Sequence, residues 1–474
     1  MKVIALERVP LRSVGRVIAA LAGVFVLFSL AGFAVLGAGS GAFIVAGLGL
    51  VPVAVYVALR WPIVFPFGLY LLLVPFDALL RTEGGAGATV TKFVGFAVIA
   101  ALLVRTVLVR RALLPPATWF AWAAFTFFAV ASLGWSVYAE QTQTTLAILV
   151  PLFALYTLAA VYPVTTADAF ALRRIIELAG VVIGVYGIYA YFTGQRLIGT
   201  RLSLSQGKIH VDPNHYAAFF VIPVALVAAR FLTDRRTSVR IASACALALF
   251  AVNVFFSGSR GGFVGIGFVL LYLGVRTRKY VTTALIAVTG LAMSFAIPNV
   301  WLRFADPTQG DNSGRNDIWA VGLHAFPHYW FAGSGFATYE EVYDDFLVQS
   351  YQRVFAGWSR PSHNLIVGTA VELGIVGLGL VLLAWWTSVR QTWGVPAGHP
   401  LAPIAYAAEA ACAGLFVCAL TIDMLWYKYL WVALMLVVLT ANAIRQRVLW
   451  SPRERATASA ARPPVLPVRD PVRF

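Results

Sequence analysis

The chain alternates long apolar runs with short polar segments over most of its length. A helix needs roughly 20 predominantly apolar residues to cross about 30 Å of hydrocarbon. The pattern predicts fourteen membrane spans, at about 17–38, 41–59, 62–80, 90–109, 117–135, 144–162, 174–192, 213–233, 240–256, 261–275, 280–297, 363–386, 402–421 and 425–443. The runs that start at 41, 240 and 261 are short, and short runs are also typical of re-entrant or tilted segments.

Composition agrees with this pattern. Hydrophobic residues make up 60% of the chain and charged residues 12%, with a mean hydropathy of +0.81. Such a chain exceeds the apolar content of soluble domains. The predicted fold class is therefore an all-α polytopic membrane protein, with one long outward-facing loop.

The basic residues predict the orientation in the membrane. If the N-terminus is cytoplasmic, every short basic loop, including DRRTSVR and RTRK, falls on the cytoplasmic side with the arginine-rich tail. The net charge of +16 is then a topology signal, and its dispersal over many loops predicts no nucleic-acid partner.

The first span is longer than the apolar region of a signal peptide, so a retained anchor is expected. Cys245, Cys412 and Cys418 lie within predicted spans and indicate neither disulfides nor a thiolate metal site.

Three segments predicted to face outward carry basic residues against the positive-inside bias. They are the loop 193–212, the turn SGSRGG, and the long loop 299–362. Their basic residues are Arg196, Arg201, Lys208, Arg260, Arg303, Arg315, Arg353 and Arg360. In a helix bundle they would converge on the mouth above His363. Solvated loop charge is the alternative and is favoured for Lys208 and Arg353. Arg260 lies between glycines that allow close backbone approach, and a charge in this six-residue turn cannot easily avoid the mouth.

His363 marks the junction between the long loop and the span 363–386. Ser362 is a favourable N-cap, so this helix is expected to start at about His363, at the membrane–water boundary. On such a helix Ala370, Gly374 and Gly377 share one stripe with His363 and would let another helix pack close beneath it. The alternative is an interfacial histidine above an ordinary helix-packing face.

Arginines and a histidine together favour one kind of chemistry. Guanidinium groups bind phosphate oxygens in a bidentate manner, which suits a lipid with a pyrophosphate head. A nearby imidazole can remove a proton from an attacking hydroxyl near neutral pH. The combination predicts glycosyl transfer from a polyprenyl-pyrophosphate donor. The sequence has no P-loop or dinucleotide fingerprint, and no cofactor is expected.

The second half of the chain carries a recognisable set of motifs. His363-Asn364 is followed by nine residues, then Gly374, two residues and Gly377; upstream lie RLSLSQGKIHVDPNHYAAFF, FFSGSRGGFVG and SGRNDIWAVGLHAFPHYWFAGSGFATYE. In this order the four blocks resemble the O-antigen ligases and, more widely, the O-antigen ligase and polymerase family. The resemblance implies a metal-independent membrane glycosyltransferase of GT-C-like architecture, usually with twelve spans. It also implies His363 as the base, Arg201, Arg260 and Arg315 as pyrophosphate ligands, and Asn214, Asn364, Gly374 and Gly377 as supporting residues.

The sequence and the resemblance together predict three regions. Residues 1–192 would form a transmembrane scaffold, 193–443 a catalytic membrane region with a periplasmic loop at 298–362, and 444–474 a disordered basic tail with affinity for anionic lipids. The expected partners are an undecaprenyl-pyrophosphate-linked glycan, an acceptor glycolipid or glycan, and membrane lipids. The expected location is the bacterial inner membrane, with both termini cytoplasmic and the site facing the periplasm.

Other polar features carry weaker hypotheses. His324 and His328 have metal-pair spacing, but Pro327 lies between them and no acid supplies a third ligand, so no metal is expected. The run EEVYDD, 340–345, could attract a cation or an acceptor amine, although such a run is more often a solvated helix face. Residues 315–326 predict an amphipathic helix on the membrane surface. Glu372 lies about 180° round the helix from His363 and is not its partner.

Three functions remain open from the sequence. The favoured one is an O-antigen ligase that adds a glycan to a distinct acceptor such as a lipid A core. The second is a polymerase that joins lipid-linked repeat units, because both reactions share a donor. A lipid-linked glycan flippase is the third, although transporters place charge near the bilayer midplane and show repeated halves, and neither feature is detected here.

Overall fold

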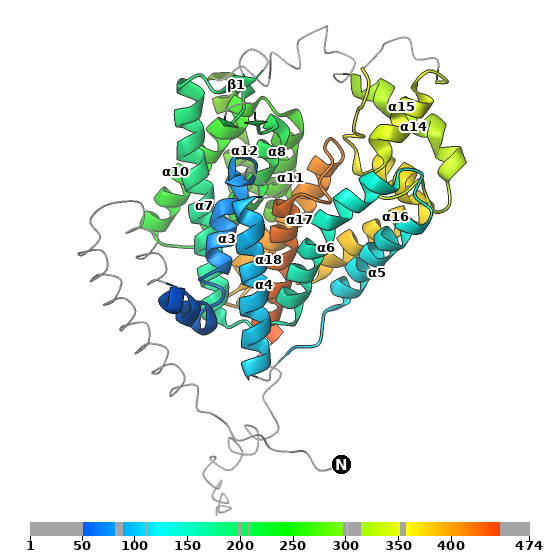
Figure 1. Ribbon diagram of the computed structural model, residues 1–474. Helices are drawn as coiled ribbons and strands as arrows, with labels where there is room; N and C mark the ends of the chain where they lie inside the picture. The colour runs from blue at the N-terminus through cyan, green and yellow to red at the C-terminus, as the bar shows by residue number, and fades with distance from the viewer. Residues whose placement is uncertain are drawn as a thin grey trace, which may run out of the picture.

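A computed structural model describes residues 51–80, 89–109, 112–197, 201–206, 209–296, 301, 314–350 and 357–445. Within these residues the chain is predominantly helical (Figure 1). The helices of the first half are α3 (Phe67–Leu73), the 3₁₀ helix η1 (Val74–Leu80), α4 (Val90–Val109), α5 (Ala117–Ala131), η2 (Ser132–Gly134), α6 (Ala139–Val161) and α7 (Thr166–Phe192). The later helices are α8 (Pro213–Phe219), α9 (Val221–Thr233), α10 (Thr237–Ser257), α11 (Arg260–Thr277), α12 (Tyr280–Ala296), α14 (Arg315–Tyr329), α15 (Tyr339–Leu347), α16 (Leu365–Arg390), α17 (Ala402–Ala419) and α18 (Lys428–Arg445).

Nine helices within the described residues are long and apolar enough to cross a membrane. They are α4 to α7, the α8–α9 pair, α10, α16, α17 and α18, which correspond to nine of the fourteen predicted spans. The segment 67–80 and α12 are shorter, and α11 carries an arginine near each end. The predicted span 17–38 and most of 41–59 lie outside the described residues. The polytopic helical membrane class is confirmed.

The loop between α7 and α8 contains strands that the apolar pattern did not predict. β1 (Arg196–Leu197) pairs antiparallel with β2 (Arg201–Leu202), and β3 (Ser205–Gln206) pairs with β4 (Ile209–His210). Each strand has two residues, too few for a period-2 pattern to stand out in the sequence. These short strands lie within one loop and leave the all-α class of the membrane bundle unchanged.

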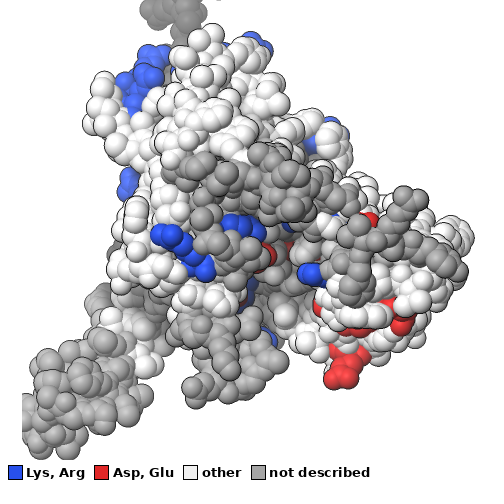
Figure 2. Space-filling view, turned by 90° about the horizontal axis from the view of Figure 1, so that it is seen from above, with Lys and Arg blue, Asp and Glu red and all other residues white. Residues whose placement is uncertain are grey.

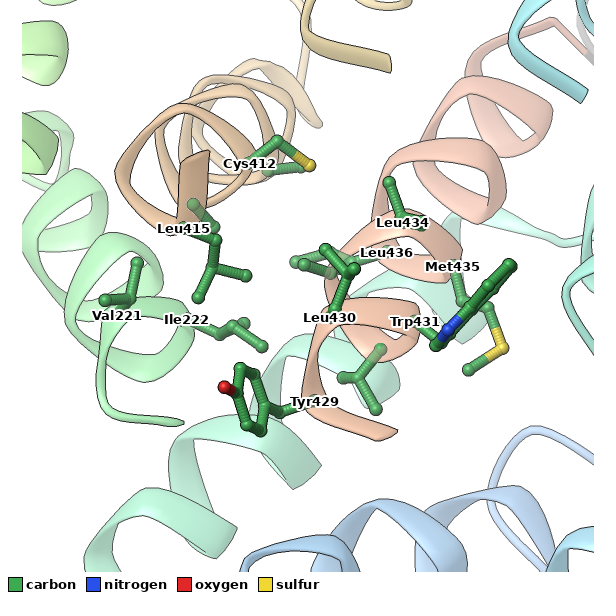
Figure 3. Close-up of a cluster of buried hydrophobic side chains, with 14 of the residues drawn as sticks. Val221, Ile222, Cys412, Leu415, Tyr429, Leu430, Trp431, Leu434, Met435 and Leu436 are labelled. Atoms are coloured by element: carbon green, nitrogen blue, oxygen red, sulfur yellow. The ribbon is translucent and has the colours of Figure 1, made fainter. Parts of the chain in front are cut away.

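The core of the bundle lies where α9, α17 and α18 meet. Side chains from these helices, including Ile222, Leu415 and Leu430, point toward one another in Figure 3. Trp431 is completely buried there and donates from its indole nitrogen to the carbonyl of Leu425, 2.8 Å away. Apolar helices that are buried on nearly all sides belong at the centre of a membrane bundle. These three helices form the buried centre of the bundle.

The polar segments gather at one end of the bundle, which we call the upper end. It carries the β1–β4 loop, α14, α15 and the first residues of α8, α11, α16 and α18 (Figure 1). The lower end carries the last residues of α9, α11, α16 and α18. Since the loops with the predicted site residues all reach the upper end, the fold brings them to one face.

The predicted amphipathic helix is α14, but its apolar face has a different partner from the one expected. Ile318, Val321 and Ala325 are buried against α15 and against Val371 of α16. The expectation that the apolar face of this helix lies on the membrane surface is wrong for Ile318, whereas Leu323 of the same expected face is 61% exposed. A second, smaller core therefore fastens α14 and α15 to the helix that follows His363.

Candidate functional site

Arg201 is held at the upper end by two acceptors from different helices. Its Nε donates to the carbonyl oxygen of Ser257 at the end of α10 (2.9 Å), and its Nη2 donates to Oδ1 of Asn214 in α8 (3.1 Å). Asn214 is itself fixed, because Asp212 caps α8 and accepts from the Asn214 backbone N–H at 2.6 Å. The predicted supporting residue Asn214 thus orients a predicted site arginine.

Arg260 is the first residue of α11, in a turn where glycines permit close packing. Ser259 caps the helix by accepting from the backbone N–H of Gly262 at 3.1 Å. A Cβ on Gly261 would lie 2.2 Å from Oγ1 of Thr421, and one on Gly262 would lie 2.6 Å from Cβ of Ala217. The sequence prediction of close backbone approach at this turn is confirmed. Arg260 is consequently placed where α8, α11 and α17 meet.

Arg315 joins the other two arginines electrostatically. Burial lowers the pKa of its guanidinium below the usual value, and the positive charges of Arg260 and Arg201 lower it further. Burial and the charge of Arg260 likewise lower the pKa of Arg201, while Asp212 raises it. These mutual effects require the three side chains to be near one another. The structure therefore brings Arg201, Arg260 and Arg315 together at the upper end.

The upper end is hollowed in this region. Seen from above, basic side chains border a hollow near the middle of the face, and acidic atoms are visible inside it (Figure 2). A separate group of acidic side chains lies toward the edge of the same face (Figure 2). A rim of positive charge around a depression favours an anionic ligand.

His363 lies before α16 and not within it. Asn364 is the N-cap, and its side-chain oxygen accepts from the backbone N–H groups of Ile366 (2.9 Å) and Val367 (3.2 Å). His363 has a φ of 46°, in the left-handed region that non-glycine residues rarely adopt. The predicted helix start at His363, with Ser362 as cap, is therefore wrong by two residues. Asparagine is the stronger cap here because its amide oxygen reaches two free N–H groups.

Asp423 holds the unusual backbone around His363. Its carboxylate accepts from the hydroxyl of Ser362 and, at 2.8 Å, from the backbone N–H of His363. Trp319 of α14 adds a bond to the same turn, from its indole nitrogen to the carbonyl of Ser362 at 2.9 Å. The Nδ1 of His363 lies 3.7 Å from Oδ2 of Asp423, beyond hydrogen-bond distance. Asp423 therefore fixes the position of the histidine through its main chain.

The charges around His363 act in opposite directions on its imidazole. Burial lowers the pKa of His363 below its ordinary value, Asp423 raises it, and Arg315 lowers it. The net direction is downward, so the ring is neutral at neutral pH. A neutral imidazole nitrogen can accept a proton, as a general base must.

The glycines of α16 have a different role from the predicted stripe. Gly374 has a φ of 64° and interrupts the helix, so Gly374 and Gly377 do not continue one helical face below His363. The backbone of residues 330–335 enters this break: Ser334 N–H donates to Val371 (3.0 Å), and Ile375 N–H donates to Trp330 (2.8 Å). A Cβ on Gly374 would lie 2.1 Å from the carbonyl oxygen of Phe331. The expected close-packing helix is wrong, and a loop takes its place.

Three further polar residues belong to this neighbourhood and were missed by the sequence interpretation. They are Asp212, His215 and Asp423. His215 stacks on the ring of Tyr427 with centroids 3.8 Å apart, and its Nδ1 lies 2.9 Å from the hydroxyl of Tyr429. Asp212 and His215 lie inside the motif DPNH, but Asp423 lies in a three-residue turn between predicted spans, where no local pattern marks it.

Other predicted features do not join the cluster. Arg196 remains at the end of α7, where its Nε donates to the carbonyl of Tyr191 at 3.2 Å. Within the EEVYDD run, Asp344 accepts from Ser359 and Asp345 accepts from Tyr138, so two of its four acids bind neighbouring segments. Lys208, Arg303 and Arg353 lie outside the described residues. Within the described ranges, no group of three or more His, Cys, Asp or Glu side chains is placed to hold a metal ion.

Part of the chain that carries this cluster is similar to a known protein family. Residues 245–382 match the family model described as O-Antigen ligase. Arg260, Arg315 and His363 lie within the matched region, whereas Arg201, Asn214 and Asp423 lie outside it. No curated protein matches the chain.

Proposed function

We propose that the protein transfers a glycan from undecaprenyl pyrophosphate to a hydroxyl of a distinct acceptor, such as a lipid A core, because residues 245–382 match the family model described as O-Antigen ligase. The observation that carries the proposal is the cluster of Arg201, Arg260 and Arg315 close to His363 at one end of a membrane bundle. The family match supports a role in O-antigen assembly. The cluster offers a base and cationic groups for a pyrophosphate leaving group.

His363 is proposed as the general base. The acceptor oxygen attacks the anomeric carbon of the donor sugar, the bond from that carbon to the pyrophosphate oxygen breaks, and the hydroxyl proton passes to the imidazole. A base with a lowered pKa is ready to accept this proton at neutral pH. Asp423 is proposed as a positioning residue, because it holds the His363 main chain.

The arginines are proposed to stabilise the leaving group. Negative charge grows on the pyrophosphate as the glycosidic bond breaks, and donors already in place stabilise that charge without reorganisation. Arg201 is held by Ser257 and Asn214, so its position does not depend on the ligand. Three guanidinium groups can take the role that a divalent ion has in other glycosyltransferases, so the reaction is proposed to need no metal.

The upper end is proposed to face the periplasm, with both termini in the cytoplasm. The short basic loops that follow α9 and α11 belong to the lower end, where the positive-inside bias places the cytoplasm. In this orientation the cluster faces the compartment in which polyprenyl-linked glycans are assembled into envelope polymers.

A product analysis distinguishes ligase from polymerase. Purified protein receives donor alone, then donor with acceptor, and the products are resolved by size. A ligase gives one addition per acceptor and no product from donor alone. A ladder of lengthening chains from donor alone would instead establish a polymerase, the second candidate.

A parallel reaction in excess EDTA tests metal dependence and is expected to keep full activity. Loss of activity that added magnesium or manganese restores would refute the metal-free mechanism.

A further inference from the structure

A cavity of about 420 Å³ opens beside the candidate site without including its predicted residues. Its wall is formed by η1, α4 and α6 on one side and by His210, Asp212, His215 and Tyr427 on the other. Neither His363 nor any of Arg201, Arg260 and Arg315 lines it. The volume lies within the range of about 300–1,000 Å³ that is usual for small-molecule sites. The proposed pyrophosphate site therefore does not account for this cavity.

The cavity has one apolar stretch that follows two membrane helices. On α4 it extends from Lys92 to Ile99, about 10 Å at 1.5 Å per residue, and on α6 it extends from Ala147 to Leu155. Phe96 of this wall is 47% exposed, and Ala147 is also exposed. Exposed apolar side chains on membrane-spanning helices face lipid, so the cavity is accessible from the bilayer.

At the start of α4 the cavity carries a positive charge that no described carboxylate pairs with. Lys428 donates to Asp77 and, at 3.1 Å, to Thr89, whose hydroxyl donates to Asp77 at 2.8 Å. This acid is therefore neutralised by Lys428. Lys92, half-buried in the first turn of α4, forms no ion pair with any described residue. The start of α4 adds the positive end of the helix dipole to the ammonium group.

The remaining polar groups of the lining leave this charge in place. Asp212 interacts with Arg201, and His215 is bonded to Tyr429. Tyr70 is 1% exposed, and its hydroxyl has no hydrogen-bond partner among the described residues. Lys92 lines the cavity, and its ammonium group is a donor that an anionic head could satisfy.

We propose that this cavity binds an anionic phospholipid of the surrounding membrane, with its phosphate at Lys92 and the upper part of one acyl chain between α4 and α6. The positive charge of Lys92 suits the phosphate, and the apolar wall suits the acyl chain. The opening toward the bilayer lets the lipid enter from the membrane. The lipid is a second ligand, separate from the one whose pyrophosphate the arginines are proposed to bind. Its binding does not depend on glycan transfer.

Photocrosslinking of the purified full-length protein in nanodiscs tests the proposal without donor or acceptor. The probes are phosphatidylglycerol and diacylglycerol, each with a diazirine in the upper half of one acyl chain, and labelled peptides are identified by mass spectrometry. We expect labelling of α4 and α6 by phosphatidylglycerol, about tenfold above that by diacylglycerol, because only the former has a charged partner for Lys92. Equal labelling by both probes, or labelling elsewhere in the chain, would overturn the proposal.

Variants locate the phosphate and the chain. Lys92→Gln should lower the phosphatidylglycerol signal on α4 and α6 about tenfold, Lys92→Arg should retain it, and Ala147→Phe should reduce it by filling the apolar stretch. Lys279→Gln is the matched control, since this lysine precedes α12 and does not line the cavity. An unchanged signal in Lys92→Gln would refute the phosphate position. Displacement of the probe by equimolar undecaprenyl phosphate, with no displacement by unlabelled phosphatidylglycerol, would make this a carrier-lipid site and refute the phospholipid.

Discussion

Arginines at the two ends of the bundle are held by different kinds of partner. At the lower end Arg276 binds the completely buried carboxylate of Glu409 at 2.8 Å, and Arg230 binds Glu177 at 2.6 Å. At the upper end Arg201 binds a carbonyl and an amide oxygen, and neither it nor Arg315 forms an ion pair with a described residue. Arg276 and Arg230 thus bind carboxylates directly, whereas Arg201 and Arg315 form no direct ion pair with a described residue.

This difference separates structure from function in a chain with many arginines. Buried charges are costly, and a carboxylate partner removes most of that cost. Arg201 and Arg315 lie near each other with no carboxylate at ion-pair distance among the described residues, so an anionic ligand would stabilise both groups. We therefore expect substitutions at the upper end to change turnover and those at the lower end to change stability.

The largest effect is expected at the upper end, for His363→Ala. The side chain is half-buried and precedes α16, so its loss removes little packing, while loss of a general base typically costs about 10²–10⁴ in rate. Transfer by purified protein should fall by this factor with an unchanged melting temperature. Wild-type turnover in this variant would end the assignment of His363 as the base.

The second-largest effect is expected for Arg260→Lys, which keeps the positive charge but removes the planar guanidinium group. An ammonium group cannot bind pyrophosphate in a bidentate manner, and loss of one stabilising donor costs about 10²-fold or more in rate. Arg201→Lys and Arg315→Lys should follow with smaller losses. The measurement is kcat for each variant beside its thermal melt. If the lysine at 260 restored full turnover, Arg260 would only neutralise charge.

Glu409→Ala is the corresponding change at the lower end. It leaves Arg276 without its partner and removes an acceptor of the Tyr272 and Thr392 hydroxyls, so about 3 kcal/mol of stability should be lost. Thermal unfolding in detergent measures the loss. Turnover per folded molecule should remain within twofold of wild type. A stable but inactive variant would show that the two ends are not separate in function.

Prediction from sequence succeeded where a local pattern fixes the structure. Apolar runs located the spans, and the turn around Arg260 revealed its own close packing through its glycines. It failed at His363, because the choice between Ser362 and Asn364 as cap depends on Asp423, about sixty residues later in the chain. The break at Gly374 was also missed, since the loop that fills it comes from residues 330–335. Contacts between distant segments leave no periodic trace in the sequence.

The pH dependence of transfer should separate the charges that surround His363. Its lowered pKa keeps the imidazole neutral to a lower pH than usual, so the acid limb of kcat/KM against pH should lie below the ordinary histidine range. Arg315 lowers this pKa, so Arg315→Gln should move the limb toward higher pH. Asp423 raises it, so Asp423→Asn should move the limb toward lower pH. Shifts in the same direction for both variants would contradict this arrangement of charges.

The smallest effect is expected for Arg236→Gln, which tests whether location alone explains the lower-end behaviour. Arg236 lies at the lower end and binds Asp234 at 2.8 Å, yet its side chain is 75% exposed. Water solvates both charges after the pair is broken, and exposed pairs contribute little to stability. Neither the melting temperature nor the turnover of this variant should change detectably. A drop comparable to that of Glu409→Ala would mean that every lower-end arginine is structural, and burial of the carboxylate would no longer explain the contrast with the upper end.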